Sequence, residues 1–252
     1  MNTKLLLRRV VKAILPHCIL VFYRNHKAKK SYGHEEKNFC PICKKSSYFG
    51  AAGVLARQKA KCPFCGSLER HRLLWLFLQK QTDFFSNVNI IILHVAPESC
   101  YEKQFKKIHK NNYITADLQN PKAMVKMDIT NIQYPDKEFD VVICNHVLEH
   151  IIDDIKAMGE FYRVLKNDGW AILSVPITDL EKTYEDKSII TEADRKKAFG
   201  QGDHVRQYGK DYVDRLKKVG FNAEIISWRQ ITNEDELKKM SIIKENIYFC
   251  KK

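Results

Sequence analysis

The chain has 252 residues, of which 44% are hydrophobic and 29% charged; this is the composition of a folded protein and excludes a disordered polymer. Its net charge of +13 is confined to one third of the sequence. Residues 1–83 carry 17 Lys and Arg against 4 Asp and Glu, whereas residues 84–252 carry 26 of each kind. A basic segment attached to a neutral domain predicts an anionic partner, either nucleic acid or a membrane surface.

The first segment, residues 1–36, is basic and begins with an amphipathic pattern. Seven apolar residues between Leu5 and Leu15 could form one face of a helix, and Pro16 would kink or end it. Such a helix could enter an anionic membrane surface, contact nucleic acid or pack on the protein itself. No apolar run approaches the roughly 20 residues of a membrane-spanning helix, and no signal-peptide cleavage site follows. We therefore expect a cytoplasmic protein, with peripheral contact at the inner face of the membrane as one reading of the basic segment.

Two CxxC pairs dominate the second segment, residues 37–83. Cys40 and Cys43 form the first pair, and Cys62 and Cys65 form the second, 18 residues further on. Each pair places two thiolates on one tight turn, and two pairs complete the closed, tetrahedral four-sulfur site of a structural Zn²⁺. A redox-active CxxC is the alternative, but nothing around the pairs is thioredoxin-like. The four other cysteines are expected to be buried thiols: Cys18, Cys100, Cys144 and Cys250.

From residue 68 onward, strand-like apolar runs alternate with helical patterns. Helices are predicted over 68–81, 151–165 and 210–219, and strands over 89–95, 113–116, 140–144, 170–175, 223–228 and 246–250. This alternation is typical of a doubly wound α/β sheet. We assign the sheet to one domain, residues 84–252.

Ligands of open parallel sheets bind beyond the carboxyl ends of the strands. His94 and Glu98 stand at the end of the first predicted strand, and Asp117 ends the second. A carboxylate at Asp117 could accept hydrogen bonds from both hydroxyls of a ribose, and Asp128 could meet an adenine amino group. Both aspartates could equally be ordinary loop acids.

The stretch that follows the strand over 140–144 resembles a known family. Val147-Leu148-Glu149-His150, then Glu160, Arg163-Val164-Leu165-Lys166 and Asp168-Gly169, look like class I S-adenosylmethionine-dependent methyltransferases, closest to their small-molecule branch. The resemblance covers residues 90–250. It implies a mostly parallel, seven-stranded, Rossmann-like sheet with S-adenosylmethionine as cofactor. The implied cofactor contacts are His94, Ala96, Glu98, Asp117, Asp128 and Asn145.

One departure from that family concerns the first loop, which is usually rich in glycine. Here the loop reads His94-Val95-Ala96-Pro97-Glu98-Ser99, without glycine, and His94 replaces the usual acidic residue. Either Glu98 supplies the carboxylate for the ammonium group of the methionine moiety, or cofactor binding is weakened.

The zinc ribbon in front of this domain resembles a bacterial subset found beside sugar-polymer and cell-surface biosynthesis. That subset carries an Asp-His-Val-Arg-x-Tyr-Gly stretch, which is present here over residues 203–209. We expect His204 to be the base that serves the methyl acceptor, with His150 and His146 as reserves, and Arg206 and Tyr208 to contact the substrate. The competing reading is that the histidines and the arginine have no catalytic role.

Three functions remain open at this point. The first is methyl transfer to a small-molecule or saccharide-type acceptor, which could be lipid-linked, in cell-surface biosynthesis. The second is an RNA methyltransferase that uses the ribbon and the basic N-terminus to bind RNA. Against it, residues 145–148 lack the Asn/Asp-Pro-Pro-aromatic signature common in methylation of base amines. The third is a non-catalytic zinc-ribbon adaptor with a vestigial cofactor domain.

Overall fold

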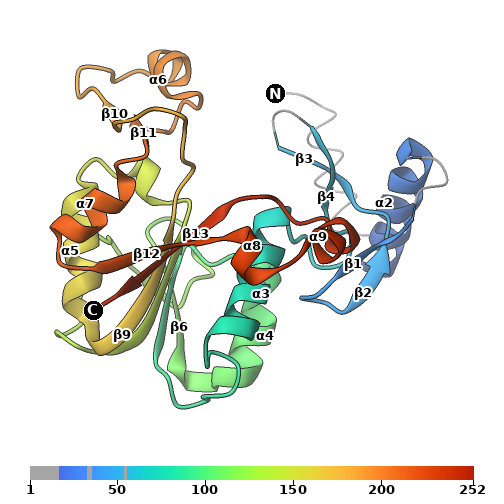
Figure 1. Ribbon diagram of the computed structural model, residues 1–252, viewed down its shortest axis with the longest axis horizontal. Coiled ribbons are helices and arrows are strands. Elements are labelled where there is room, and N and C mark those ends of the chain that lie inside the picture. The colour runs from blue at the N-terminus through green and yellow to red at the C-terminus, as the bar shows by residue number, and fades with distance from the viewer. Residues whose placement is uncertain (1–16, 33–35, 54–55) are drawn as a thin grey trace. The chain divides into compact units, whose positions relative to one another are not determined.

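The computed structural model describes residues 17–32, 36–53 and 56–252, which form two compact units (Figure 1). The first unit contains the chain up to residue 82 together with residues 231–245, and the second contains residues 83–230 and 246–252. The helix expected between Leu5 and Leu15 lies outside the described residues. The division differs from the predicted one, because 231–245 belongs to the first unit and not to the sheet domain.

The first unit is built from two small hairpins and three helices among its described residues. The predicted helix over 68–81 is confirmed as α3, which begins after Leu68. Strands β1 and β2 pair antiparallel, as do β3 and β4. The elements are α2 (His17–Tyr32), β1 (Asn38–Cys40), β2 (Lys45–Ser47), β3 (Gly50–Ala52), β4 (Arg57–Lys61), α3 (Glu69–Gln81) and α9 (Glu234–Met240).

Residues 231–245 are tied to this unit by polar contacts that cross long stretches of sequence. The guanidinium of Arg72 donates to the carbonyl of Ser241 at 2.6 Å, and the hydroxyl of Ser241 donates to the carbonyl of Lys59 at 2.7 Å. Lys80 forms an ion pair with Glu236 at 2.7 Å. Arg72 is fully buried, so its donors need such carbonyl partners.

The second unit contains the seven-stranded sheet that the resemblance implied. The strand order is β12-β13-β9-β8-β5-β6-β7; β13 is antiparallel to both neighbours, and β9, β8, β5, β6 and β7 are parallel. The doubly wound, mostly parallel class I methyltransferase fold is therefore confirmed. The strands are β5 (Ile92–Val95), β6 (Tyr113–Asp117), β7 (Val125–Lys126), β8 (Phe139–Asn145), β9 (Leu165–Ser174), β12 (Asn222–Ser227) and β13 (Asn246–Lys251).

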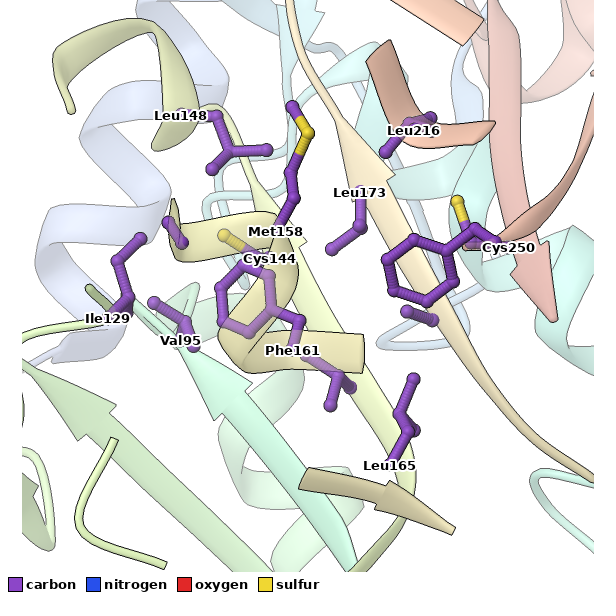
Figure 2. Close-up of a cluster of buried hydrophobic side chains, with 14 of the residues drawn as sticks. Val95, Ile129, Cys144, Leu148, Met158, Phe161, Leu165, Leu173, Leu216 and Cys250 are labelled. Carbon is purple, nitrogen blue, oxygen red and sulfur yellow. The ribbon is translucent and has the colours of Figure 1, made fainter. Parts of the chain in front are cut away.

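Helices cover both faces of this sheet. On one face, α5 (Asp154–Val164) and α7 (Tyr212–Lys218) pack on alternate strand residues, and Met158 and Phe161 lie over Cys144 and Leu173 (Figure 2). On the other face, α4 (Ser99–His109) brings Phe105 against His94 and Tyr113. Successive strand residues point to opposite faces, which explains why the strands read as continuous apolar runs.

The remaining short elements of this unit are connections. They are the 3₁₀ helices η1 (Lys110–Asn112) and η2 (Leu148–His150), the helices α6 (Glu192–Phe199) and α8 (Trp228–Ile231, which ends in the first unit), and the strands β10 (Tyr184–Glu185) and β11 (Arg206–Gln207).

Two predicted boundaries move for physical reasons. The helix expected over 151–165 begins only at Asp154, because Asp153 caps it by accepting from the backbone N–H of Lys156. The strand expected over 170–175 begins at Leu165, and its pairing with β8 shifts register between Leu165 and Trp170. Gly169 lies there because an added Cβ would meet the carbonyl oxygen of Lys166 at 2.9 Å.

Between β9 and α7 the chain leaves the sheet at the carboxyl end of β9 and returns 35 residues later; we call residues 176–209 the returning segment. It contains α6 and the antiparallel pair of short strands β10 and β11, which project beyond the sheet in Figure 1. No helix among the described residues is long and apolar enough to cross a membrane.

Candidate active site

The carboxyl ends of β5, β6 and β8 lie side by side in the sheet. Val95 pairs with Ala116 on one side and with Cys144 on the other, so the residues that follow these strands meet at one edge. Directly after β5, Ala96 takes a positive φ of 47°, and its N–H donates to the carbonyl of Ala116 at 2.8 Å. Alanine thus adopts the left-handed conformation that glycine prefers, and the turn forms without a glycine.

Glu98 is held at this edge by two strands. Its carboxylate lies 2.7 Å from Nε2 of His94, at the end of β5, and it accepts from Nδ2 of Asn145, at the end of β8, at 3.1 Å. Oδ1 of Asn145 is buried and has no hydrogen-bond partner among the described residues. A buried acceptor without a donor is costly, so this oxygen is suited to a ligand N–H or O–H.

His94, which was expected to contact the cofactor, has partners within the protein. Its side chain is fully buried, with Nδ1 2.8 Å from the hydroxyl of Tyr113 and Nε2 on Glu98. Both ring nitrogens are engaged, so His94 positions the carboxylate of Glu98.

Asp117 and Asp128 lie on neighbouring loops, joined by the backbone hydrogen bond from Met127 to the carbonyl of Asp117. Oδ1 of Asp117 accepts from the N–H groups of Gln119 and Asn120 at 2.7 and 2.8 Å, which shapes the turn. Oδ1 of Asp128 accepts from the backbone and hydroxyl of Thr130. These bonds to Thr130 hold the pKa of Asp128 below its ordinary value. In each aspartate one carboxylate oxygen shapes the loop, and Oδ2 is the atom that remains for a ligand.

The three predicted histidines gather around the loop after β8. The rings of His150 and His204 meet edge to face, with centroids 4.8 Å apart. Nδ1 of His146 lies 3.5 Å from Oε1 of Glu149. The returning segment is fixed there, because the N–H of Val205 donates to the carbonyl of Glu149 at 2.9 Å. His204 thus joins three residues that precede it by 54 positions or more. We call this set the histidine cluster: His146, Glu149, His150 and His204.

Burial lowers the pKa of His204, whose side chain is almost inaccessible. Because the ordinary pKa of histidine is near 6.5, His204 is neutral at pH 7 and can accept a proton or donate a lone pair. His146 and His150 are more exposed, with about a quarter and a third of their side-chain surface accessible. The cluster is therefore buried on one side and open on the other.

Glu149 is the member that the sequence analysis missed as a functional residue, since it was quoted only as part of the family resemblance. It is 2% exposed, and its Oε2 atom has no hydrogen-bond partner among the described residues. The available signal was a glutamate flanked by apolar residues directly after a buried strand.

Arg206 and Tyr208, which were expected to contact the substrate, are buried among partners within the protein. Arg206 is 2% exposed and donates to the carbonyls of Leu148, Ile151 and Ile152 and to Glu185. Tyr208 is fully buried and donates to Oδ2 of Asp154 at 2.7 Å. These hydrogen bonds tie the returning segment to the loop after β8 and to Asp154 at the start of α5.

Gly209 completes the same anchoring. A Cβ there would lie 2.6 to 2.8 Å from the backbone of Leu180 and Lys182, so only glycine fits. The 203–209 motif is thus explained mainly as an anchor for the returning segment, with His204 as the exception.

The four predicted metal ligands lie together in the first unit. Sγ of Cys40 is 3.6 Å from Sγ of Cys65, and Sγ of Cys43 is 3.8 Å from Sγ of Cys62. A tetrahedral zinc site with Zn–S bonds of about 2.3 Å requires sulfurs about 3.8 Å apart. All four sulfurs lie within 4.8 Å of one another, so the cluster could hold a metal ion.

The turns that carry the cysteines have matching backbones. The residue after each pair has a positive φ, 56° at Lys44 and 76° at Gly66, and donates back to the carbonyl of Cys40 or Cys62. The hydrogen bonds among the four thiols, with Cys43 as the first partner of Cys40, lower the pKa of the Cys40 thiol and raise the pKa of the Cys43 and Cys62 thiols. Thiolate is the form that binds metal.

The other described cysteines agree with the sequence interpretation. Cys100, Cys144 and Cys250 are buried, and no disulfide joins them. Burial raises the pKa of Cys144 and of Cys250, so both are unreactive thiols at neutral pH. The side chain of Cys18 lies outside the described residues.

Comparison with known proteins gives one family match. Residues 98–173 match the family described as a methyltransferase domain. Among solved structures, the chain is similar to an S-adenosylmethionine-dependent methyltransferase from Archaeoglobus fulgidus, with 16% identity, a TM-score of 0.45 and coverage of 71% of this chain and 93% of that chain. It is also similar to one from Mesorhizobium loti, with 13% identity, a TM-score of 0.43 and coverage of 65% and 91%. No curated protein matches the sequence.

Proposed function

We propose that the chain, whose residues 98–173 match a methyltransferase domain, transfers a methyl group from S-adenosylmethionine to a small-molecule or saccharide-type acceptor, lipid-linked acceptors included, in cell-surface biosynthesis. The observation that carries the proposal is the pairing of two features at one sheet edge. A carboxylate–amide pair suited to the cofactor follows β5 and β8, and a partly enclosed histidine cluster follows β8 directly.

The residues at the sheet edge fit the cofactor. Glu98 offers a carboxylate for the ammonium group of the methionine moiety, and the unpartnered Oδ1 of Asn145 offers a second acceptor beside it. The backbone turns at Ala96, whose side chain is a single methyl group, so the cofactor could approach the backbone closely there. Asp117 would hold the ribose through Oδ2, and Asp128 would lie toward the adenine. S-adenosylmethionine, when bound, supplies a methyl group on a sulfonium that is already reactive.

The chain's own contribution is to orient the acceptor and to remove its proton. An acceptor hydroxyl or amine loses its proton as its lone pair forms the new bond to carbon, so a nearby neutral imidazole assists the step. His204 is the first candidate because it is neutral at pH 7, with His150 and His146 beside it. Positioning supplies the rest of the acceleration.

The position of the returning segment favours a small acceptor. It is held at the loop after β8 by Val205 and Arg206, so His204 lies in a partly enclosed cluster. Such a site suits a single hydroxyl group on a small or extended molecule better than the surface of a folded nucleic acid.

For the first unit we propose a structural Zn²⁺ bound by Cys40, Cys43, Cys62 and Cys65. The sulfur–sulfur distances and the matched turns support it. Four thiolates leave no open coordination position, so the ion would stabilise the fold and take no part in catalysis.

We further propose that the basic N-terminal segment places the enzyme at anionic membranes, close to a lipid-linked acceptor. Removal of residues 1–34 should abolish sedimentation with vesicles that contain phosphatidylglycerol and leave cofactor affinity unchanged. Full-length protein that ignores such vesicles and binds a structured RNA tightly would contradict this.

A labelling experiment tests the proposed acceptor class. The full chain is incubated with methyl-labelled S-adenosylmethionine and an extract of its own cells, which is then separated into small molecules, glycans and glycolipids, RNA and protein. We expect label in the small-molecule or glycan fraction, and strongly reduced label with His204→Ala. Label in RNA or protein, or in no fraction, would overturn the proposal.

A further inference from the structure

The histidine cluster has the composition of a transition-metal site. Among the described residues, two groups of His, Cys, Asp or Glu could hold a metal ion, the four cysteines and the set Glu149, His150 and His204. In the second set, one ligand atom from each residue lies within 4.8 Å of the other two. Ligand atoms about 2.0–2.2 Å from an ion lie roughly 3–3.5 Å apart, so side-chain shifts of about 1–2 Å would complete the site.

The buried carboxylate of Glu149 supplies an independent observation. The side chain is 98% removed from solvent, Oε1 lies 3.5 Å from Nδ1 of His146, and Oε2 has no partner among the described residues. A buried carboxylate oxygen with no donor costs several kcal/mol unless a proton or a cation compensates it. No Lys or Arg of the described chain forms an ion pair with Glu149 among the contacts within 4.0 Å.

The orientation of His150 agrees with a ligand role. Its Nδ1 lies 3.0 Å from the carbonyl oxygen of Asp203, which accepts only if Nδ1 carries the proton. The other ring nitrogen, Nε2, then carries the lone pair. Metal-binding histidines commonly donate their second N–H to a backbone carbonyl or a carboxylate in this way.

The geometry points to a divalent transition-metal site formed by Glu149, His150 and His204. Two imidazoles and one carboxylate are a donor set that suits zinc and ferrous iron and leaves coordination positions open. The site goes beyond the proposed function, since it would bind metal whether or not methyl transfer occurs. In the metal-bound protein the lone pairs of His150 and His204 are engaged, so the base role proposed for His204 belongs to the metal-free protein and His146 takes it in the metal-bound one.

The ion would also fasten the returning segment. Glu149 and His150 belong to η2, whereas His204 belongs to the segment that comes back after β9. A metal bond between them would add to the hydrogen bond from Val205 to Glu149.

Zinc stoichiometry tests the inference. Full-length protein is dialysed against a low-micromolar zinc buffer, and metal is measured by elemental analysis for the wild type and for Glu149→Gln, His204→Ala and His150→Asn. We expect each variant to hold one zinc ion fewer per chain than the wild type. The result is the difference in zinc content between the wild type and each variant, so zinc held by the four cysteines cancels out.

His26→Ala is the matched control, because His26 is an exposed histidine on α2, and it should keep the wild-type stoichiometry. His150→Asn guards against misfolding, since a third of the His150 side-chain surface is exposed and its loss leaves the core intact. Equal zinc content in the wild type and in folded His150→Asn would overturn the inference, as would a loss that His26→Ala shares.

Discussion

Glu98 is the residue on which the proposed cofactor site depends most, because its carboxylate lies between the ends of β5 and β8. The sequence placed Glu98 beside the first strand and offered it as the substitute carboxylate, and the structure holds it between His94 and Asn145. It could not show that both nitrogens of His94 are occupied, because Tyr113 lies on a neighbouring strand, 19 residues away. Contacts across strands depend on register, which a single sequence does not reveal.

Ala96 carries a prediction about backbone strain. An L-residue in the left-handed region costs about 1–2 kcal/mol, which glycine avoids at the expense of a more flexible unfolded chain. We expect Ala96→Gly to leave the free energy of unfolding unchanged or to raise it by up to about 1 kcal/mol. Ala116→Gly, in the buried strand β6, should lower it by more than about 1 kcal/mol. Denaturant unfolding of both variants checks this, and a clear loss of stability in Ala96→Gly would contradict the account.

At the scale of elements, the sequence predicted the strands of the sheet well and its irregular parts poorly. Strands with continuous apolar runs, such as β5 and β8, were readable because both of their faces are buried. The short strands β7, β10 and β11 were not, since two residues leave no periodicity to detect. The motif over 203–209 was noticed, but its polar residues were taken for a substrate site when most of them anchor the chain.

Arg206 should therefore matter for stability more than for substrate binding. Arg206→Met removes the hydrogen bonds that Arg206 donates to three backbone carbonyls and to Glu185. Because the site is buried, the loss should lower the free energy of unfolding by about 3–5 kcal/mol. Arg195→Lys is the control on the same segment, because Arg195 makes one long contact of 3.4 Å to the carbonyl of Ile189. An Arg206→Met protein with the wild-type free energy of unfolding would contradict this anchoring role.

At the scale of the whole molecule, the boundary between the units is the largest surprise. Chain order assigned residues 231–245 to the sheet domain, yet Arg72, Lys59 and Lys80 hold them in the first unit. The two residues of each contact are separated by more than 150 positions in the sequence. Arginine, lysine, serine and glutamate are all common on protein surfaces. No local pattern could have predicted them.

The arrangement of the first unit predicts how zinc loss spreads. Arg72 donates to Ser67, which lies 3.3 Å from Sγ of Cys40, and also to Ser241. Because the free energy of structural zinc binding is folding free energy, Cys62→Ser should lower zinc content and hydrogen-exchange protection of β1 to β4 and of α9. Strands β5 and β8 should keep their protection. Protection lost in β5 as early as in β1, or zinc content unchanged, would contradict this.

The central claim, that the edge after β5 and β8 binds S-adenosylmethionine, is tested most directly by calorimetric titration with that cofactor. The account predicts saturable binding to the wild type. It predicts a tenfold to hundredfold weaker affinity for Glu98→Gln, since a charge-assisted hydrogen bond is worth about 1.5–3 kcal/mol. Glu102→Gln, one turn further along α4, should bind as the wild type does. A wild-type protein that does not bind the cofactor, or a Glu98→Gln variant with unchanged affinity, would contradict the claim.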